Sequence, residues 1–343
     1  MKFFNYPSST NACFSKDQGA ASTALFFLQL TQQVCSIRKI LKYYKNRTKI
    51  RGFLMHTDNK TVLELVQFDK YDVIELIKLS TSVNWDYDEH EIRTVMSSGK
   101  IFGHKNAEGE IVSSAAIIPY DTDLASIGMV IVNKEYRGLG LGKKATNKCI
   151  DSVSKDTTIM LISTEDGKPL YENLGFISVD YVHKYLSDRY NQTQMFIDRE
   201  ITLEKYSEYD FNEIVELDLA AFGDNRRKFL LNRIDQSKKC LVVRNQKGKI
   251  IGFGLSILGP INLILGPIVA PDPQTAAIII DGLALNHRGN LRIDVPSSND
   301  ELMLFLEKSG FVKVSEPPIM IKNSVNMPLR NKELFAIAAQ IFG

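Results

Sequence analysis

Three glycines at alternate positions are the clearest sign of ligand chemistry in this sequence. Gly138, Gly140 and Gly142 lie in the stretch IVNKEYRGLGLGKKATNKCI, residues 131–150, between an apolar run and a helix-like one. Glycine loses more conformational freedom on folding than any other residue, so such a cluster indicates backbone that turns sharply or approaches a ligand closely. The ligands to consider are a dinucleotide pyrophosphate, a nucleoside triphosphate and the pyrophosphate of coenzyme A; a tight turn without a ligand is the alternative.

The glycine spacing does not match the two most familiar phosphate-binding motifs. A dinucleotide fingerprint reads Gly-x-Gly-x-x-Gly near the start of a βαβ unit, whereas here Gly-x-Gly-x-Gly follows a β-hairpin pattern. A Walker A loop needs Ser or Thr after its Gly-Lys, but Gly142-Lys143 is followed by Lys144. Unpaired N–H groups at a helix N-terminus can bind an anion without either motif.

The elements around the loop alternate between short strand patterns and helical ones. Residues 61–68 read as a strand and 71–83 as an amphipathic helix, followed by two strands around a turn at Glu108-Gly109. Residues 124–132 then predict a strand, 142–155 a helix, 158–164 a strand and 167–176 a short helix. The glycines therefore lie between a predicted strand and a predicted helix.

The second half of the chain echoes the first. The segments at 73–76, 105–112 and 171–176 recur in the same order at 214–217, 244–251 and 306–311, with offsets of 141, 139 and 135 residues. A unit of this length is too long for a solenoid repeat, so the echo indicates two similar domains from a tandem duplication. The expected fold class is mixed α/β (α+β), with domains at 55–198 and 199–343.

Composition excludes several classes of protein. The chain has 343 residues, of which 44% are hydrophobic and 24% charged, as in ordinary globular proteins. No apolar run reaches the roughly 18 residues of a transmembrane helix, and four scattered cysteines with no CxxC pattern argue against a disulfide framework or a metal site. We therefore expect a cytoplasmic protein that binds no membrane and no metal.

Charge is unevenly distributed. Residues 1–54 hold nine Lys/Arg and one acid, a net charge of +8, which leaves 33 basic and 39 acidic residues, or −6, in the remainder. The mildly acidic body does not predict nucleic-acid binding. The basic segment 1–54 lacks a secretory cleavage pattern and is either a true basic tail, of organelle-presequence type or otherwise, or an extension upstream of a natural start at Met55.

The loop and its context resemble the GNAT superfamily, the GCN5-related N-acetyltransferases. Arg137-Gly138-Leu139-Gly140-Leu141-Gly142 is similar to the family's Arg/Gln-x-x-Gly-x-Gly/Ala loop, with a strand before it and YENLGF about thirty residues after it. The resemblance covers residues 61–186. Asn133 stands where the family often has proline. The resemblance implies two domains that each hold a mixed, mostly antiparallel twisted sheet flanked by helices.

The resemblance implies that acetyl-CoA is the co-substrate. The glycines would let backbone N–H groups and the helix dipole reach the pyrophosphate without interference from Cβ atoms. The strand before the loop would diverge from its neighbour and offer its backbone to the pantetheine arm, with an N–H near Val130 available to a developing oxyanion. The residues implied for coenzyme binding are Val130, Val132, Arg137, Gly138, Leu139, Gly140, Leu141, Gly142 and Lys143.

The family's Tyr-x3-Gly-Phe motif falls on Tyr171, which would protonate the departing thiolate. A phenol, with an unperturbed pKa of about 10, can do so because the pKa of a thiol is about 8.5. The general base is harder to assign because residues 124–132 contain no acid; Glu165 is our candidate, with Asp166, Asp86 and Asp88 as alternatives.

The acceptor pocket is expected beside the loop between the first two helices. This loop commonly walls that pocket in the family, so Trp85, the chain's only tryptophan, and Tyr87 are candidate acceptor contacts. In the second half Asp294 is a further candidate. Packing alone would account equally well for the two aromatic residues.

The second half has lost the coenzyme motifs. The sequence PDPQTAA replaces the glycine loop and Leu306 replaces Tyr171; Pro271 and Pro273 also lack N–H donors. Residues 200–323 resemble the C-terminal acetyltransferase-like domain of two-domain proteins of the YitH/HolE type. We infer a degenerate copy that closes one side of the acceptor cleft, and an amphipathic helix over the final residues, 331–343, that docks on a neighbouring lobe.

These inferences lead to one function and two alternatives. The chain is expected to be an acetyl-CoA-dependent N-acetyltransferase that transfers an acyl group to a small-molecule amine by direct attack in a ternary complex. The alternatives are a non-catalytic acyl-CoA-binding or sensing protein and a protein N-acetyltransferase. The sequence leaves open whether the chain is a monomer or a homodimer.

Overall fold

The computed structural model describes residues 63–193 and 200–343 of the chain. The basic segment 1–54, with the question of a start at Met55, lies outside the described residues, and so does the predicted domain boundary at 198/199. Residues 61–343 form one compact unit.

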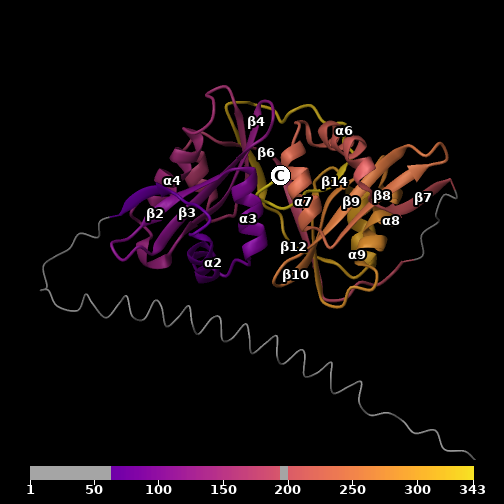
Figure 1. The fold of residues 1–343 in the computed structure, drawn as a ribbon, viewed down its shortest axis with the longest axis horizontal. Coiled ribbons are helices and arrows are strands. Elements are labelled where there is room, and N and C mark those ends of the chain that lie inside the picture. The colour runs from indigo at the N-terminus through magenta and orange to yellow at the C-terminus, as the bar shows by residue number, and fades with distance from the viewer. Residues whose placement is uncertain (1–62, 194–199) are drawn as a thin grey trace, which may run out of the picture. The chain divides into compact units, whose positions relative to one another are not determined.

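Two stretches of the chain share one order of strands and helices (Figure 1). The first runs through β1 (Glu64–Gln67), α2 (Val73–Ser82), α3 (Glu89–Ser98), β2 (Lys100–Lys105), β3 (Ile111–Pro119), β4 (Leu124–Val132), the 3-10 helix η1 (Lys134–Tyr136), α4 (Leu141–Ile150), β5 (Thr158–Ile162), α5 (Lys168–Glu172) and β6 (Ile177–Ser187). The second runs through β7 (Ile201–Lys205), η2 (Glu208–Asp210), α6 (Phe211–Phe222), α7 (Arg227–Gln236), β8 (Lys239–Asn245), β9 (Ile250–Leu258), β10 (Asn262–Val269), α8 (Pro273–Ala284), β11 (Asn290–Pro296), α9 (Asp300–Lys308) and β12 (Val312–Ser315). Strands β13 (Pro318–Lys322) and β14 (Leu334–Ala336) follow.

Within the described residues the strands form one continuous mixed sheet. Its order is β1-β2-β3-β4-β5-β13-β6-β11-β10-β9-β8-β7, with β12 beside β6 and β14 beside β10. The β4–β5 and β10–β11 pairs are parallel, and the other pairs in the described ranges are antiparallel. The predicted mixed, mostly antiparallel architecture is therefore confirmed.

The two halves exchange strands. Strand β13, which comes late in the chain, lies between β5 and β6 in the sheet of the first half. Strand β6 in turn pairs along its later residues with β11 and β12 of the second half. Each half therefore contributes a strand that pairs with strands of the other half. As a result, the two domains predicted from the sequence do not correspond to two separate parts of the sheet.

Both faces of the first half's sheet are covered by helices. Ile118 of β3 belongs to the apolar cluster that contains Leu76 of α2, whereas its neighbour Ile117 packs in the cluster with Ala145 of α4. Successive side chains of a strand point to opposite faces, so a strand covered on both sides is apolar at almost every position. This explains why β4, the strand that leads into the glycine loop, is apolar at most positions, with Ser126 as its one hydroxyl residue.

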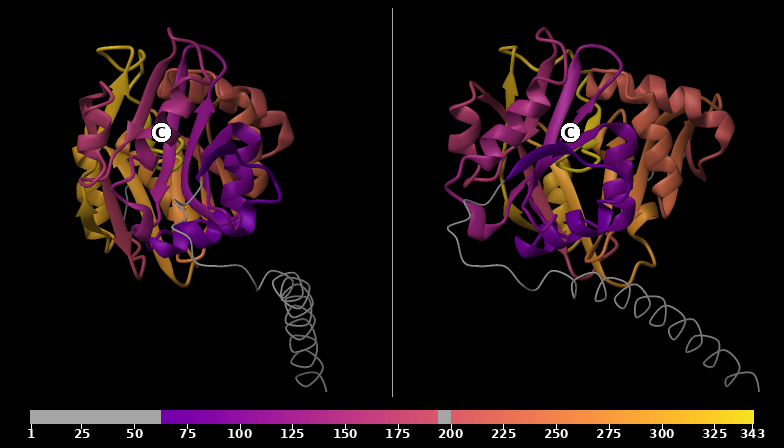
Figure 2. Two further views of the ribbon diagram at one scale, coloured as in Figure 1. Left: turned by 90° about the vertical axis from the view of Figure 1, so that its left-hand side faces the viewer. Right: turned by 60° about the vertical axis from the view of Figure 1, so that its left-hand side comes forward.

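The C-terminal segment is not the amphipathic helix that its apolar spacing predicted. After β14 the chain continues without regular structure into the first half, where Ser126 Oγ of β4 donates a hydrogen bond to the carbonyl of Ile341 (2.7 Å). In each view of Figures 1 and 2 the C-terminus lies among strands of both halves. Ile337, Ile341 and Phe342 are buried, so the apolar residues are enclosed by neighbours instead of forming one face of a helix.

A buried carboxylate also ties the halves together. Asp224, between α6 and α7, accepts hydrogen bonds from the backbone N–H groups of Thr122, Asp123 and Leu124, at 3.1, 3.1 and 2.9 Å. Thr122 and Asp123 precede β4, and Leu124 is its first residue. The second half thereby fixes the start of the strand that carries the glycine loop.

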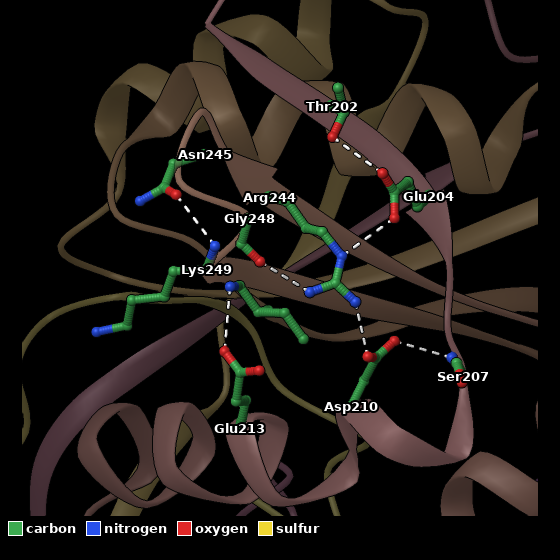
Figure 3. A network of polar contacts seen from close by, with 10 residues as sticks. Thr202, Glu204, Ser207, Asp210, Glu213, Arg244, Asn245, Gly248 and Lys249 are labelled. Carbon is green, nitrogen blue, oxygen red and sulfur yellow. Dashed lines mark hydrogen bonds and ion pairs between the residues drawn. The ribbon is translucent and has the colours of Figure 1, made fainter.

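A polar network at the outer edge of the second half is satisfied by its own members (Figure 3). Arg244 donates to Asp210 Oδ1 (2.7 Å), to Glu204 Oε2 (3.1 Å) and to the carbonyl of Gly248 (3.0 Å). Asp210 also accepts from the N–H of Ser207 in a capping box at η2. The guanidinium joins β7, the β8–β9 hairpin and the start of α6, which is a structural role.

Candidate active site

The glycine loop forms the N-terminus of α4. Gly138 and Gly140 have φ angles of +81° and +72°, in the left-handed region that side chains disfavour. A Cβ atom at either position would meet no other atom within 4 Å, so the space over the loop is open. Gly142 is different, because it is buried in the first turn of α4 and a Cβ there would contact Val132 at 3.4 Å.

The start of α4 has the character of an anion site. The first turn of a helix leaves N–H groups without intrahelical partners, and the helix dipole adds positive potential there. No acidic residue lies in this first turn. Arg137 and Lys143 lie on either side of the glycines and are exposed.

Beside this loop, β4 and β5 diverge. Their parallel pairing ends at Ile127 and Leu161, although β4 continues to Val132. A cavity of about 940 Å³ opens along the free edge of β4; we call it the glycine-loop cavity. It is lined by Val83, Trp85, Ile127, Gly128, Met129, Val130, Ile131, Val132, Tyr136, Arg137, Gly138, Gly140, Leu141, Gly142, Lys143, Ile162, Thr164, Asp166, Gly167, Leu170 and Tyr171.

A β-bulge interrupts β4 at the middle of this edge. Met129 has a φ of +53°, and the β3–β4 register shifts between Ser114 and Ala116. Ser114 Oγ donates to the Met129 carbonyl (2.8 Å) and so holds the bulge from the neighbouring strand. A bulge leaves its extra residue outside the ladder of hydrogen bonds, so backbone groups near Met129 are available to a ligand.

Tyr171 on α5 lines the same cavity. Its side chain is buried, with 8% exposed, and packs edge-on against Phe176 at a centroid distance of 6.0 Å. Within the described part of the chain the phenol has no hydrogen-bond partner. Burial, and to a smaller extent Cys149, raises the pKa of the phenol, so Tyr171 carries its proton at neutral pH.

A second cavity, of about 480 Å³, lies between the two halves; we call it the central cavity. Its lining residues come from both: Asn84, Trp85, Asp86, Tyr87, Asp88, Glu91, Gly128, Met129, Ile162, Thr164, Glu165, Lys184, Gln236, Ile257, Leu258, Gly259, Pro260, Ile264, Arg292, Val314, Ser315, Glu316, Pro317, Ala339, Gln340 and Ile341. Trp85, Gly128, Met129, Ile162 and Thr164 line both cavities. The two cavities therefore meet at the β4 bulge.

The aromatic wall at this junction is held by α2. Ser80 Oγ donates to the Trp85 carbonyl (2.9 Å), and the Trp85 N–H donates to the Ser80 carbonyl (3.1 Å). The rings of Trp85 and Tyr87 lie 6.3 Å apart. Burial, with a smaller contribution from Glu91, raises the pKa of Tyr87, so this wall is uncharged.

Most of the residues predicted from the sequence line one of the two cavities. Leu139 and Asp294 do not. Leu139 is 54% exposed and absent from both linings. Asp294 is buried, and its carboxylate accepts from Arg292 Nε (2.7 Å) and from Gln340 Nε2 (3.0 Å). Glu165, the candidate base, is exposed and lines the central cavity.

Sequence reasoning missed the two cations of the central cavity, Lys184 of β6 and Arg292 of β11. Arg292 is held by Asp294, whereas the Lys184 ammonium makes no hydrogen bond or ion pair within the described ranges. Burial, and next the charge of Arg292, lowers the pKa of the Lys184 ammonium. No local signal marks either residue, because the exchange of strands brings them together.

In the second half the corresponding gap between strands is filled by the chain itself. The parallel β10–β11 pairing ends at Leu265 and Ile293, as β4–β5 pairing does in the first half. Beyond it, β14 pairs with β10 at Ile268 and Val269, and the Ile337 N–H donates to the Asp294 carbonyl of β11 (3.0 Å). The edge that stays free in β4 is therefore occupied in β10.

The described residues, 63–193 and 200–343, contain neither a membrane-spanning helix nor a metal-binding cluster. No helix in these ranges has the length and hydrophobicity that spanning a membrane requires. No group of His, Cys, Asp and Glu side chains in them could hold a metal ion.

The diverging strands, the β4 bulge and the glycine turn before α4 define a GNAT acetyltransferase fold, and the second half repeats the order of strands and helices without the glycine turn. Two acetyltransferase (GNAT) domain models match the chain, at residues 80–195 and 214–336. The chain is also 39% identical to the uncharacterised N-acetyltransferase YitH of Bacillus subtilis (strain 168) over 281 residues, which are 82% of this chain and 98% of that protein. The chain therefore belongs to the GNAT family.

Solved structures show the same fold. A candidate acetyltransferase from Pyrococcus horikoshii superposes with a TM-score of 0.67 at 20% identity, over 85% of this chain and 100% of that one. A tandem GNAT protein from the clavulanic acid biosynthesis pathway superposes with a TM-score of 0.56 at 11% identity, over 77% and 100% of the two chains. At such identities the likeness concerns the fold alone.

Proposed function

We propose that this GNAT enzyme transfers the acetyl group of acetyl-CoA to the amine of a small molecule, by direct attack in a ternary complex. One observation carries the proposal. The glycine-loop cavity, which suits a coenzyme, meets the central cavity, which suits an acceptor, at Gly128 and Met129 of the β4 bulge.

The residues of the glycine-loop cavity fit coenzyme A. Open space over Gly138 and Gly140 at a helix N-terminus suits the pyrophosphate, with Arg137 and Lys143 adding positive charge. The free edge of β4 at Val130 and Val132 offers backbone groups to the pantetheine arm, as a sheet edge does to an added strand.

Acetyl-CoA supplies an activated thioester, and the protein supplies orientation and proton transfer. The amine nitrogen forms the new C–N bond as the C–S bond breaks. Tyr171 gives a proton to the sulfur, and a backbone N–H of the bulge near Met129 or Val130 stabilises the charge that develops on the carbonyl oxygen. The products are an amide and the free thiol.

Glu165 is our proposed base for the proton that the amine loses. It lines the central cavity in the loop before α5 and makes no ion pair in the described part of the chain. Asp86 is the alternative, because it lines the same cavity and also has no bonded partner there.

The shape of the central cavity favours a small acceptor over a protein. Segments of the first half line it, together with the end of β9 and the turn after it (257–260) and residues 339–341 of the C-terminal segment. Its volume of about 480 Å³ lies within the usual range of small-molecule sites.

The second half is proposed to bind no coenzyme. Strand β14 hydrogen-bonds to β10 at the positions that correspond to the free edge of β4. Asp272 also caps α8 by accepting from the Thr275 N–H (2.7 Å), which places a carboxylate where a pyrophosphate would need to lie.

The experiment is a thiol-release assay with acetyl-CoA against a panel of amines, using wild-type protein and Gly140→Asp. We expect turnover in the wild type. We expect no coenzyme binding in Gly140→Asp, because the carboxylate opposes the pyrophosphate in both volume and charge. Coenzyme binding without turnover on any amine would favour the sensing protein instead.

The matched control is Gly109→Asp in the β2–β3 turn. Gly109 has a φ of +83° and, like Gly140, has no atom within 4 Å of an added Cβ. Both substitutions impose the same backbone strain, and only one lies in the glycine-loop cavity. Equal coenzyme affinity in the two variants would contradict the assignment of the loop.

A further inference from the structure

The central cavity combines apolar walls with two cations on one side. Trp85, Ile257, Ile264 and Pro317 are among its apolar lining residues. Lys184 and Arg292 line the central cavity and are absent from the glycine-loop cavity. The cations therefore lie apart from the junction at which an amine would meet the thioester.

The register of the sheet places the two cations next to each other. Lys184 of β6 lies opposite Asp294 of β11, and Leu186 lies opposite Arg292. Residues two apart on a strand share a face of the sheet. One cation comes from each half of the chain, so the pair exists only because β6 and β11 are neighbours.

Neither cation is fully used by the protein. Arg292 donates to Asp294 through Nε and Nη2, at 2.7 and 3.2 Å, and Nη1 has no hydrogen-bond partner among the described residues. A guanidinium has five N–H donors, so the side that faces away from Asp294 remains able to bind. Asp294 accepts from Arg292 and Gln340 and makes no ion pair with Lys184 in the described residues.

Five other carboxylates line the central cavity, and none of them is within ion-pair distance of Lys184 or Arg292 in the described residues: Asp86, Asp88, Glu91, Glu165 and Glu316. Asp88, Glu91 and Glu316 bond to other groups of the protein. Asp86 influences both cations electrostatically without contact. A half-buried ammonium without a hydrogen-bonded partner is costly, and an anionic ligand would relieve that cost.

We propose that the acceptor is an amine that also carries a carboxylate, which Lys184 and the free side of Arg292 bind while the amine reaches the β4 bulge. This inference rests on the proposed function and names the substrate class of that site. The apolar walls suit a hydrocarbon body between the two ends. Lys184 and Arg292 are specificity-determining residues, and neither takes part in proton transfer.

The test compares amines that differ only in the carboxylate: phenylalanine with 2-phenylethylamine, leucine with 3-methylbutylamine, and 6-aminohexanoate with hexylamine. We expect kcat/KM to be at least tenfold higher for the carboxylated member of at least one pair. Lys184→Met should lower that preference at least tenfold, and Lys184→Arg should keep most of it. The control Lys155→Met, at an exposed lysine beyond α4, should leave the preference unchanged.

Three results would overturn the inference. They are equal or lower kcat/KM for every carboxylated amine, an unchanged preference in Lys184→Met, or a preference for O-phosphoethanolamine over all carboxylates, which would assign the cations to a phosphate. If only the simple amines are turned over, the inference of a carboxylate on the acceptor is refuted, while the proposed N-acetyltransferase function still stands.

A binding measurement keeps the test independent of turnover. Trp85 is the only tryptophan and lines both cavities, so its fluorescence can report ligands in either. If no amine releases thiol, the proposed function fails. A saturable fluorescence change with 6-aminohexanoate that Lys184→Met abolishes would then still support the anion site, and no change in the wild type would refute it.

Discussion

The phenol of Tyr171, which lines the glycine-loop cavity, shows how burial keeps a candidate general acid protonated. Tyr171 is buried in the glycine-loop cavity, and its pKa is raised by that burial. A raised phenol pKa means that the neutral, protonated form persists to higher pH than the usual value of about 10. Tyr171 is therefore in the protonated form that a general acid needs, and it cannot serve as the base for the amine.

We expect Tyr171→Phe to lower kcat roughly 10²-fold while leaving coenzyme affinity nearly unchanged. Below pH 10 the wild-type kcat/KM should rise with pH as the acceptor amine loses its proton, with no falling limb, because Tyr171 stays protonated. Thiol-release kinetics between pH 6 and 10 measure both effects. Tyr209→Phe, at a side chain that is 94% exposed, is the control, and equal kcat in the two variants would remove the acid role.

At the scale of elements, β4 is fixed from three sides before it reaches the glycine loop. Asp224 holds the turn before it, Ser114 holds its bulge, and the C-terminal segment packs against its middle. A Cβ atom on Gly128 would lie 2.6 Å from Ile341 Cγ1 and 2.9 Å from Ile341 Cα. The close approach of this segment to β4 therefore requires glycine at position 128.

We expect Gly128→Ala to destabilise the protein by about 1–3 kcal/mol, because the added methyl group overpacks a contact with backbone that cannot simply rotate away. Acceptor KM should also rise, since Ile341 lines the central cavity. Urea unfolding and steady-state kinetics measure the two effects. Gly142→Ala is the control for stability, because its Cβ would meet Val132 at an ordinary 3.4 Å; equal unfolding midpoints would refute the packing argument.

The parts of the site that the sequence predicted are those built from neighbours in the chain. A strand, a glycine turn and a helix follow one another from residue 124 to 150, so their arrangement is local. Lys184 and Arg292 could not be predicted in this way, because they belong to strands that become neighbours only through the exchange between halves. The C-terminal segment was mistaken for a helix because a stretch buried on every side has no informative apolar period.

At the scale of the whole molecule, two copies of one fold are used differently. In the first half the gap beyond the β4–β5 pairing is open and lined by the glycine loop; in the second it is closed by β14 and the residues after it. The same segment then crosses to the first half and lines the central cavity through Ala339 and Ile341. The segment that fills the gap between strands in the second half therefore also lines the central cavity.

This arrangement predicts one coenzyme site per chain. Isothermal titration of the wild-type protein with coenzyme A should give a stoichiometry of one, since the backbone groups of β10 that could bind a second pantetheine arm already pair with β14. Gly140→Asp should remove all binding, with no weaker site left, while Gly109→Asp keeps a stoichiometry of one. A stoichiometry of two, or residual saturable binding in Gly140→Asp, would show that the coenzyme displaces β14 from β10 and that the second half contains a second coenzyme site.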